Sequence, residues 1–207
     1  MDVYLDFDHT LYNPITLTDE MLSAICDKIV DCTNENIKRE ELLLELKGMF
    51  NREHIYNIFE LARYFGEKYN VDSKLLIEVL NKVLYNGSKN VFDDVIPFLK
   101  LLKEKGHKIY MLSYYEYGLE YQMAKITGSR LCDLFDVIIV TAEKKYELTI
   151  DYTNAIFIDD NPSDLEGLLS RKPYRLIRIK RKEGRYSLKP VNVENIEEVE
   201  VLTDIKL

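Results

Sequence analysis

The feature that most constrains the fold is the alternation of helical and extended patterns after residue 90. Three segments place apolar residues at the three- and four-residue spacing of amphipathic helices: 91–106, 115–128 and 163–172. Four short apolar runs alternate with them: 107–113, 135–141, 154–160 and 174–181. Strands that alternate with helices form right-handed crossovers and a mostly parallel sheet. With the apolar run at 2–7, the pattern predicts an α/β fold with a doubly wound, mostly parallel sheet. After about Lys182 the sequence predicts a turn at residues 183–185, followed by an irregular or edge-strand tail to which we assign no function.

Residues 15–87 have a different pattern, which is helical throughout. Four amphipathic segments follow one another with short joins: 17–32, 37–50, 53–69 and 73–85. Thr18 and Asp72 are the expected N-caps of the first and last of these helices. The pattern predicts an antiparallel helical bundle inserted into an α/β core made of residues 1–14 and 88–207. Because the insert follows the first strand, and ligands bind at the carboxyl ends of parallel strands, we expect it to cap the site.

Composition limits the partners that the chain is expected to bind. The formal net charge of -8 argues against nucleic acid, which binds basic surfaces, although an acidic protein can hold a locally positive pocket for a small anion. The three cysteines form no CxxC pair, which is typical of a reducing cytoplasm. No apolar run approaches the roughly 20 residues of a membrane span. We therefore expect a cytoplasmic protein without nucleic-acid or membrane partners; nothing in the sequence indicates an oligomeric state.

Charged and hydroxyl side chains stand where the predicted strands end. In chain order they are Asp6 and Asp8, then Ser113, then Lys144 and Lys145, then Asp159 and Asp160. Carboxyl ends of parallel strands meet at one edge of a sheet, so these groups are expected to converge. Clustered carboxylates raise each other's pKa unless a cation neutralises them. A hard divalent cation with oxygen ligands, Mg²⁺ above all, does so and attracts phosphate.

This set of groups suits phosphoryl transfer. An ionised aspartate can attack phosphorus and form an aspartyl-phosphate, while a second aspartate protonates the leaving oxygen and then activates water. A hydroxyl and a lysine supply hydrogen bonds and charge to the phosphoryl oxygens. Any one of these aspartates alone is more often a turn former or a helix cap. Their ordered occurrence at four strand ends favours a catalytic site.

DFDHTL (residues 6–11), the strand end at Ser113, a lysine after the run at 135–141, and IFIDDNPSD (residues 156–164) occur in this order. Together they resemble the four motifs of the haloacid dehalogenase (HAD) superfamily. The resemblance covers the chain from residue 1 to about 180, with the helical insert in the position of that superfamily's C1-type cap. It implies a Rossmann-like core, phosphatase-type hydrolysis and a Mg²⁺ cofactor.

The resemblance also implies a role for each matched position. Asp6 would be the nucleophile and a Mg²⁺ ligand, and Asp8 the general acid/base, with its backbone carbonyl on the metal. Thr10 would hold the turn of the first motif, and Ser113 with the amide of Tyr114 would bind the phosphoryl group. Asp160 would be a direct metal ligand, while Asp159 and Asp164 would orient the metal or its waters.

The third motif departs from the superfamily pattern, in which a lysine usually precedes a proline. This chain has EKKYEL at residues 143–148, so Lys144 and Lys145 are both candidates for binding the phosphoryl group. Lys145 fits the usual register better, and we prefer it.

Within the superfamily, the resemblance to phosphatase members is stronger than to dehalogenase members, because the dehalogenase pattern has no carboxylate at the position of Asp8. The sequence therefore predicts a Mg²⁺-dependent phosphohydrolase. Its expected partner is a small phosphorylated metabolite of the sugar phosphate or nucleotide class, because a closing cap excludes bulky substrates. Two alternatives stay open: a phosphoryl-transferring mutase, and a non-catalytic binding or regulatory protein that keeps the fold.

Overall fold

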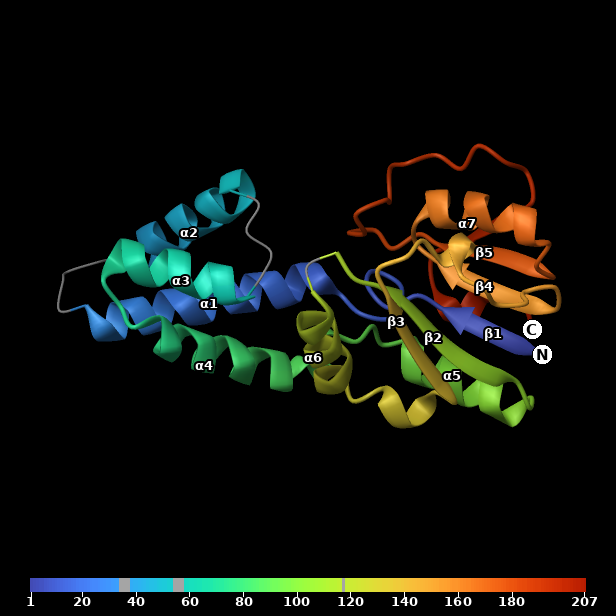
Figure 1. Cartoon of the computed structure of the whole chain (residues 1–207), viewed down its shortest axis with the longest axis horizontal. Coiled ribbons are helices and arrows are strands. Elements are labelled where there is room, and N and C mark those ends of the chain that lie inside the picture. The colour runs from blue at the N-terminus through green and yellow to red at the C-terminus, as the bar shows by residue number, and fades with distance from the viewer. Residues whose placement is uncertain (34–37, 54–57, 117) are drawn as a thin grey trace.

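The computed structural model describes residues 1–33, 38–53, 58–116 and 118–207, with only the backbone described at residues 49–53. One end of the molecule is a sheet covered by helices, and a group of four helices extends from it at the other end (Figure 1). Among the described helices, none is both long and apolar enough to cross a membrane.

The sheet has six strands, all parallel, in the order β3-β2-β1-β4-β5-β6. Their bounds are β1 (Asp2–Leu5), β2 (Lys108–Tyr114), β3 (Val137–Thr141), β4 (Ala155–Asp159), β5 (Arg175–Ile179) and β6 (Ile196–Val199). The N-terminal strand β1 lies in the centre, where Asp2 pairs with Lys108 of β2 and with Ala155 of β4. The predicted doubly wound parallel sheet is thus confirmed, and the C-terminal tail supplies its edge strand β6.

Both faces of the sheet are covered by helices. Successive side chains of a strand point to opposite faces, so Val3 and Leu5 of β1 join one apolar core and Tyr4 joins the other. The first core includes the buried face of α5 (Val95–Glu104), and the second includes Leu165 and Leu168 of α7 (Pro162–Leu168). Burial on both faces explains why the strands read as continuous apolar runs in the sequence.

Four helices lie between β1 and β2 in the chain, as predicted: α1 (Pro14–Cys32), α2 (Arg39–Glu53), α3 (Ile58–Tyr69) and α4 (Ser73–Tyr85). Asp72 caps α4 by accepting a hydrogen bond from the amide of Lys74, which confirms the expected cap. The expected cap at Thr18 is wrong. The N-cap is Asn13, five residues earlier: its side chain accepts bonds from two amides of the first turn, and Pro14 pre-sets the helical φ.

The helix α6 (Leu119–Ser129) links the sheet to the helical insert. It follows β2 and also packs against α4. The approach is closest at Gly128, where an added Cβ would lie 1.9 Å from the carbonyl oxygen of Leu84 in α4. Only glycine permits this contact, so Gly128 allows α6 to pack closely against α4.

Candidate active site

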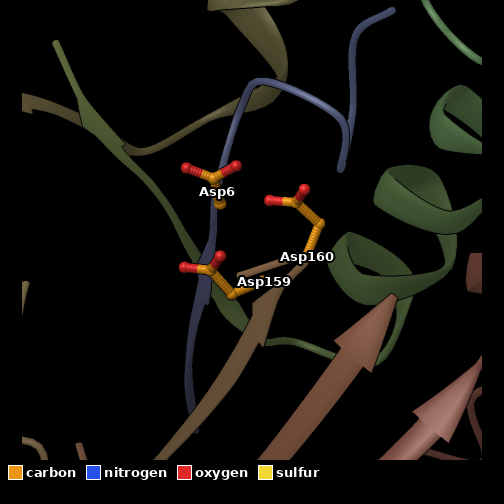
Figure 2. Close-up of side chains that lie close together, drawn as sticks. All are labelled: Asp6, Asp159 and Asp160. Carbon is orange, nitrogen blue, oxygen red and sulfur yellow. The ribbon is translucent and has the colours of Figure 1, made fainter. Parts of the chain in front are cut away.

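Three buried carboxylates meet at the carboxyl ends of the two central strands (Figure 2). Asp6 follows β1, Asp159 ends β4, and Asp160 comes directly after it; one carboxylate oxygen of each lies within 4.8 Å of those of the other two. The amide of Asp6 donates to the carbonyl of Ile158 over 2.9 Å, which continues the β1–β4 pairing into the site. Neighbouring parallel strands thus produce the predicted convergence.

A buried ammonium joins this cluster, from the short turn after β3. Lys145 Nζ lies 2.6 Å from Asp6 Oδ1 and 2.6 Å from Asp159 Oδ2. The hydroxyl of Tyr152 donates to the Lys145 carbonyl and holds that turn in place. Lys144 is exposed, and its ammonium lies 4.9 Å from the ring centre of Tyr114. The structure therefore brings Lys145, and not Lys144, to the carboxylates.

The cluster carries more negative charge than one ammonium neutralises. Burial raises the pKa of Asp6 from 3.8 to about 7, against the opposing effect of Lys145. The pKa of Asp160 is also raised, by burial and then by the charges of Asp6 and Asp159. Asp160 Oδ2 is buried and has no hydrogen-bond partner among the described residues. Buried oxygen donors in charge excess fit a hard divalent cation such as Mg²⁺.

Asp8 faces a different set of partners, although it lies only two residues from Asp6. Lys125 Nζ lies 2.8 Å from Asp8 Oδ1 and 2.7 Å from Oδ2, and Gln122 Nε2 donates to Oδ2 over 2.8 Å. Sequence reasoning missed Gln122 and Lys125. Their i, i+3 spacing on the helix after the Ser113 strand was the available signal, but only the structure shows that both are buried.

Ser113 and Thr10 are both fully buried beside the site. Ser113 Oγ accepts a hydrogen bond from Gln122 Nε2 over 2.8 Å. Thr10 lies in the tight turn that follows β1, in which His9 has a φ of 60°. The carbonyl of Thr10 accepts a bond from Arg181 Nη2 over 3.0 Å, while its hydroxyl has no partner among the described residues.

Asn161 connects the two remaining predicted aspartates. It caps α7, its amide donates to Asp159 Oδ1 over 2.9 Å, and its side chain donates to Asp164 Oδ2 over 2.8 Å. These bonds fix the orientation of the loop after β4 and link Asp159 to Asp164 through Asn161.

A cavity of about 660 Å³ opens onto these groups. Asp6, Asp8, Tyr114, Gln122, Lys125, Lys145, Asp159, Asp160 and Asp164 line it. The helices α1, α2 and α3 contribute Pro14, Ile15, Thr18, Asp19, Met21, Leu22, Lys47 and Leu61. Of the sequence-predicted site residues, Thr10, Ser113 and Lys144 are not part of its lining. The cavity thus lies between the carboxyl edge of the sheet and the insert.

The C-terminal tail also reaches this cavity, through Arg185 and Tyr186. The buried guanidinium of Arg178 in β5 donates to the Tyr186 carbonyl, and Lys189 Nζ donates to Ser163 Oγ over 2.6 Å. The sequence assigned this tail no function, because no periodic pattern marks it. Its anchors are long-range contacts that only the folded chain displays.

No protein-family model and no curated protein matches the sequence. Solved structures do match. A HAD phosphatase from Thermococcus onnurineus is 21% identical, with a TM-score of 0.61, over 98% of this chain and 94% of that chain. YfnB from Bacillus subtilis, described as a putative HAD hydrolase bound to magnesium, is 13% identical with a TM-score of 0.60, over 98% of this chain and 95% of that chain. A 2-haloacid dehalogenase from Pseudomonas syringae is 17% identical with a TM-score of 0.57, over 99% of this chain and 96% of that chain. The chain therefore has the fold of the HAD superfamily.

Proposed function

We propose that this protein is a Mg²⁺-dependent phosphohydrolase that cleaves a small phosphomonoester through an aspartyl-phosphate on Asp6. The observation that carries the proposal is the buried cluster of Asp6, Asp159 and Asp160, in which one oxygen of Asp160 has no partner among the described residues. Asp8 lines the same cavity. A nucleophile, a proton donor and a candidate cation site therefore share one cavity.

The carboxylates of Asp6 and Asp160, with the backbone carbonyl of Asp8, would hold the Mg²⁺, and Asp159 and Asp164 would orient them. The bound ion would supply positive charge that keeps Asp6 ionised and attracts the phosphoryl oxygens. The magnesium-bound B. subtilis structure of the same fold supports this assignment. Oxygen-only donors and burial support Mg²⁺ over softer metals.

The reaction proceeds in two displacements at phosphorus. An oxygen of Asp6 attacks, a new P–O bond forms, and the ester P–O bond breaks while Asp8 gives its proton to the leaving oxygen. Asp8, now ionised, then takes a proton from a water that attacks the same phosphorus and regenerates Asp6. Lys145, at 2.6 Å from Asp6 Oδ1, orients the nucleophile and faces the developing charge. The products are an alcohol and inorganic phosphate.

Asp8 is the reason to propose phosphate-ester hydrolysis over dehalogenation, since a halide leaving group needs no proton. The helical insert, residues 15–87, would act as a cap over the core formed by residues 1–14 and 88–207. Side chains of α1, α2 and α3 line the cavity, and its volume of about 660 Å³ suits a ligand the size of a sugar phosphate or nucleotide.

The test is hydrolysis of p-nitrophenyl phosphate with Mg²⁺ by the parent protein and by Asp6→Asn. We expect turnover in the parent, none with Asp6→Asn, and none in the parent with a chelator. Asp19→Asn is the matched control, because Asp19 also lines the cavity but pairs with Lys47 instead of joining the cluster. Equal rates for parent and Asp6→Asn, or full activity in chelator, would refute the proposal.

Two alternative functions, a mutase and a non-catalytic binding protein, predict different results. A phosphoryl-transferring mutase would return the phosphate on a second hydroxyl of a sugar phosphate, which product analysis detects. A non-catalytic binding protein would turn over no member of a panel of phosphorylated metabolites.

A further inference from the structure

The helix α6 places two buried polar side chains against Asp8. Gln122 and Lys125 are each about 5% exposed, and both line the cavity. Polar side chains are rarely buried to this extent unless they are fully hydrogen-bonded. Here their partners are Asp8 and Ser113, which lie at the ends of two neighbouring strands.

Gln122 connects those two strand ends through a single nitrogen. Its Nε2 lies 2.8 Å from Asp8 Oδ2 and 2.8 Å from Ser113 Oγ. A side-chain amide carries two N–H donors, so both bonds form at the same time. Gln122 therefore fixes the distance between the Asp8 carboxylate and the Ser113 hydroxyl.

Lys125 holds the same carboxylate from one side. Its ammonium lies 2.8 Å and 2.7 Å from the two oxygens of Asp8, so rotation of the carboxylate breaks at least one bond. The ammonium also lies 5.2 Å from the ring centre of Tyr121. Both oxygens of the ionised carboxylate thus have donors. When Asp8 is protonated, Oδ1 can carry the proton while Oδ2 keeps its bonds from Gln122 and Lys125.

We propose that Gln122 and Lys125 are positioning residues that hold the Asp8 carboxyl group at the bond to be cleaved. The proposal rests on the proposed function, in which Asp8 protonates the leaving oxygen. Proton transfer needs the donor within hydrogen-bond reach of the acceptor, and a displacement of about 1 Å costs about 100-fold in rate. Without these two side chains, the structure contains no other described hydrogen bond to the Asp8 carboxylate.

The test uses substituted phenyl phosphates, which share a shape but differ in how much the leaving oxygen needs a proton. We measure kcat/KM, which reports the first displacement only, for p-nitrophenyl phosphate and for phenyl phosphate. Lys125→Met and Gln122→Leu are expected to lose about 10- to 100-fold on phenyl phosphate and clearly less on p-nitrophenyl phosphate. A merely structural role would lower both substrates equally, and that result would overturn the proposal.

Two further variants separate positioning from folding. Thr127→Ala changes an exposed side chain of the same helix and is expected to leave both rates unchanged. Lys125→Arg keeps a cationic donor and is expected to recover part of the loss on phenyl phosphate. If Lys125→Met fails to fold, Gln122→Leu and Lys125→Arg still give the leaving-group comparison.

The last arm is a double-variant cycle. In an Asp8→Asn background, Lys125→Met is expected to cause no further loss of kcat/KM on p-nitrophenyl phosphate, because its effect passes through Asp8. A further loss of the same size as in the parent background would overturn the proposal. Failure of the proposed function gives a different result, since the parent itself would then hydrolyse neither substrate.

Discussion

The ammonium of Lys145 lies 2.6 Å from a carboxylate oxygen of Asp6, although 139 positions separate the two residues in the chain. The same ammonium lies 2.6 Å from Asp159, so one side chain joins the ends of β1 and β4. All three residues are buried. The contact is therefore part of both the stability of the sheet edge and the chemistry of the site.

The two adjacent lysines give the first prediction. Lys145→Met leaves two buried carboxylates without their cation, so we expect a loss of about 3–5 kcal/mol in the free energy of unfolding. We also expect a drop of about 100-fold or more in kcat/KM. Lys144→Met removes only an exposed cation–π contact with Tyr114 and is expected to cost under about 1 kcal/mol. Denaturant titration and steady-state kinetics compare the two; equal effects would contradict the assignment of Lys145.

Asp160 gives the second prediction, because one of its buried oxygens has no partner among the described residues. Without metal, Asp160→Asn removes a charge that repels Asp6 and Asp159, and we expect it to raise stability by about 1–3 kcal/mol. With Mg²⁺, the parent is expected to gain thermal stability by mass action, and Asp160→Asn is not. Thermal unfolding with and without Mg²⁺ measures both effects. Asp133→Asn, at an exposed position, serves as the control and should behave like the parent.

The third prediction concerns pH. Burial raises the folded-state pKa of Asp6 from 3.8 to about 7, and the pKa of Asp159 and of Asp160 is raised in the same direction. At these three carboxylates the folded protein therefore holds more protons than the unfolded chain between about pH 4 and 7. Their contribution to the free energy of unfolding then falls as pH rises through that window, by up to about 1.4 kcal/mol per pH unit for each proton.

His9 acts in the opposite sense, because burial lowers its pKa to about 4 and its contribution to stability grows as pH rises. The comparison that isolates the carboxylates is the difference in unfolding free energy with and without Mg²⁺, from which His9 cancels. Because the metal binds the ionised carboxylates, we expect that difference to grow from pH 5 to pH 7. A difference that is independent of pH would contradict a metal site at Asp6 and Asp160.

The fourth prediction concerns the link between the C-terminal segment and the turn after β1. Arg181 forms a two-pronged ion pair with Asp94, at 2.8 Å and 2.9 Å, and also donates to the Thr10 carbonyl. Arg181→Met is expected to cost about 3–5 kcal/mol, because Asp94 then loses its buried partner. Arg181→Lys is expected to recover little of the lost stability, since an ammonium cannot form the two-pronged pair that the guanidinium makes with Asp94. Lys182→Met, at an exposed neighbour, is the control in denaturant titrations, and an equal loss there would refute the role of Arg181.

The sequence predicted those parts of the fold that local patterns determine. Continuous apolar runs such as 154–160 identified the central strands, because strands buried on both faces lack alternation. The predicted start of α1 at Thr18 was too late, because residues 14–16 show little apolar periodicity. Asn13 and Pro14 are typical helix-start residues and could have indicated the true start. The edge strand β6 contains two adjacent exposed glutamates, Glu197 and Glu198, and shows no apolar pattern of its own. Its conformation depends on pairing with β5.

The candidate site follows the same division. Strand ends predicted Asp6, Asp159 and Asp160 as neighbours, because parallel register carries their ends to one edge. The partners of Asp8 could not be predicted, since the burial of Gln122 and Lys125 depends on how α6 packs between the sheet and α4. Arg185 and Tyr186 were missed for a related reason, as the anchors of the tail are contacts between distant segments.

The central place of β1 in the sheet has a consequence for the order of events during synthesis. β1 is made before both of its neighbours in the sheet, because β2 begins only at Lys108 and β4 only at Ala155. The helices α1 to α4 contact one another locally and are able to form meanwhile. Asp6 is thus made before its carboxylate neighbours Asp159 and Asp160, which follow some 150 residues later in the chain. A chain released before residue 160 has the helices α1 to α4 but lacks the complete carboxylate cluster.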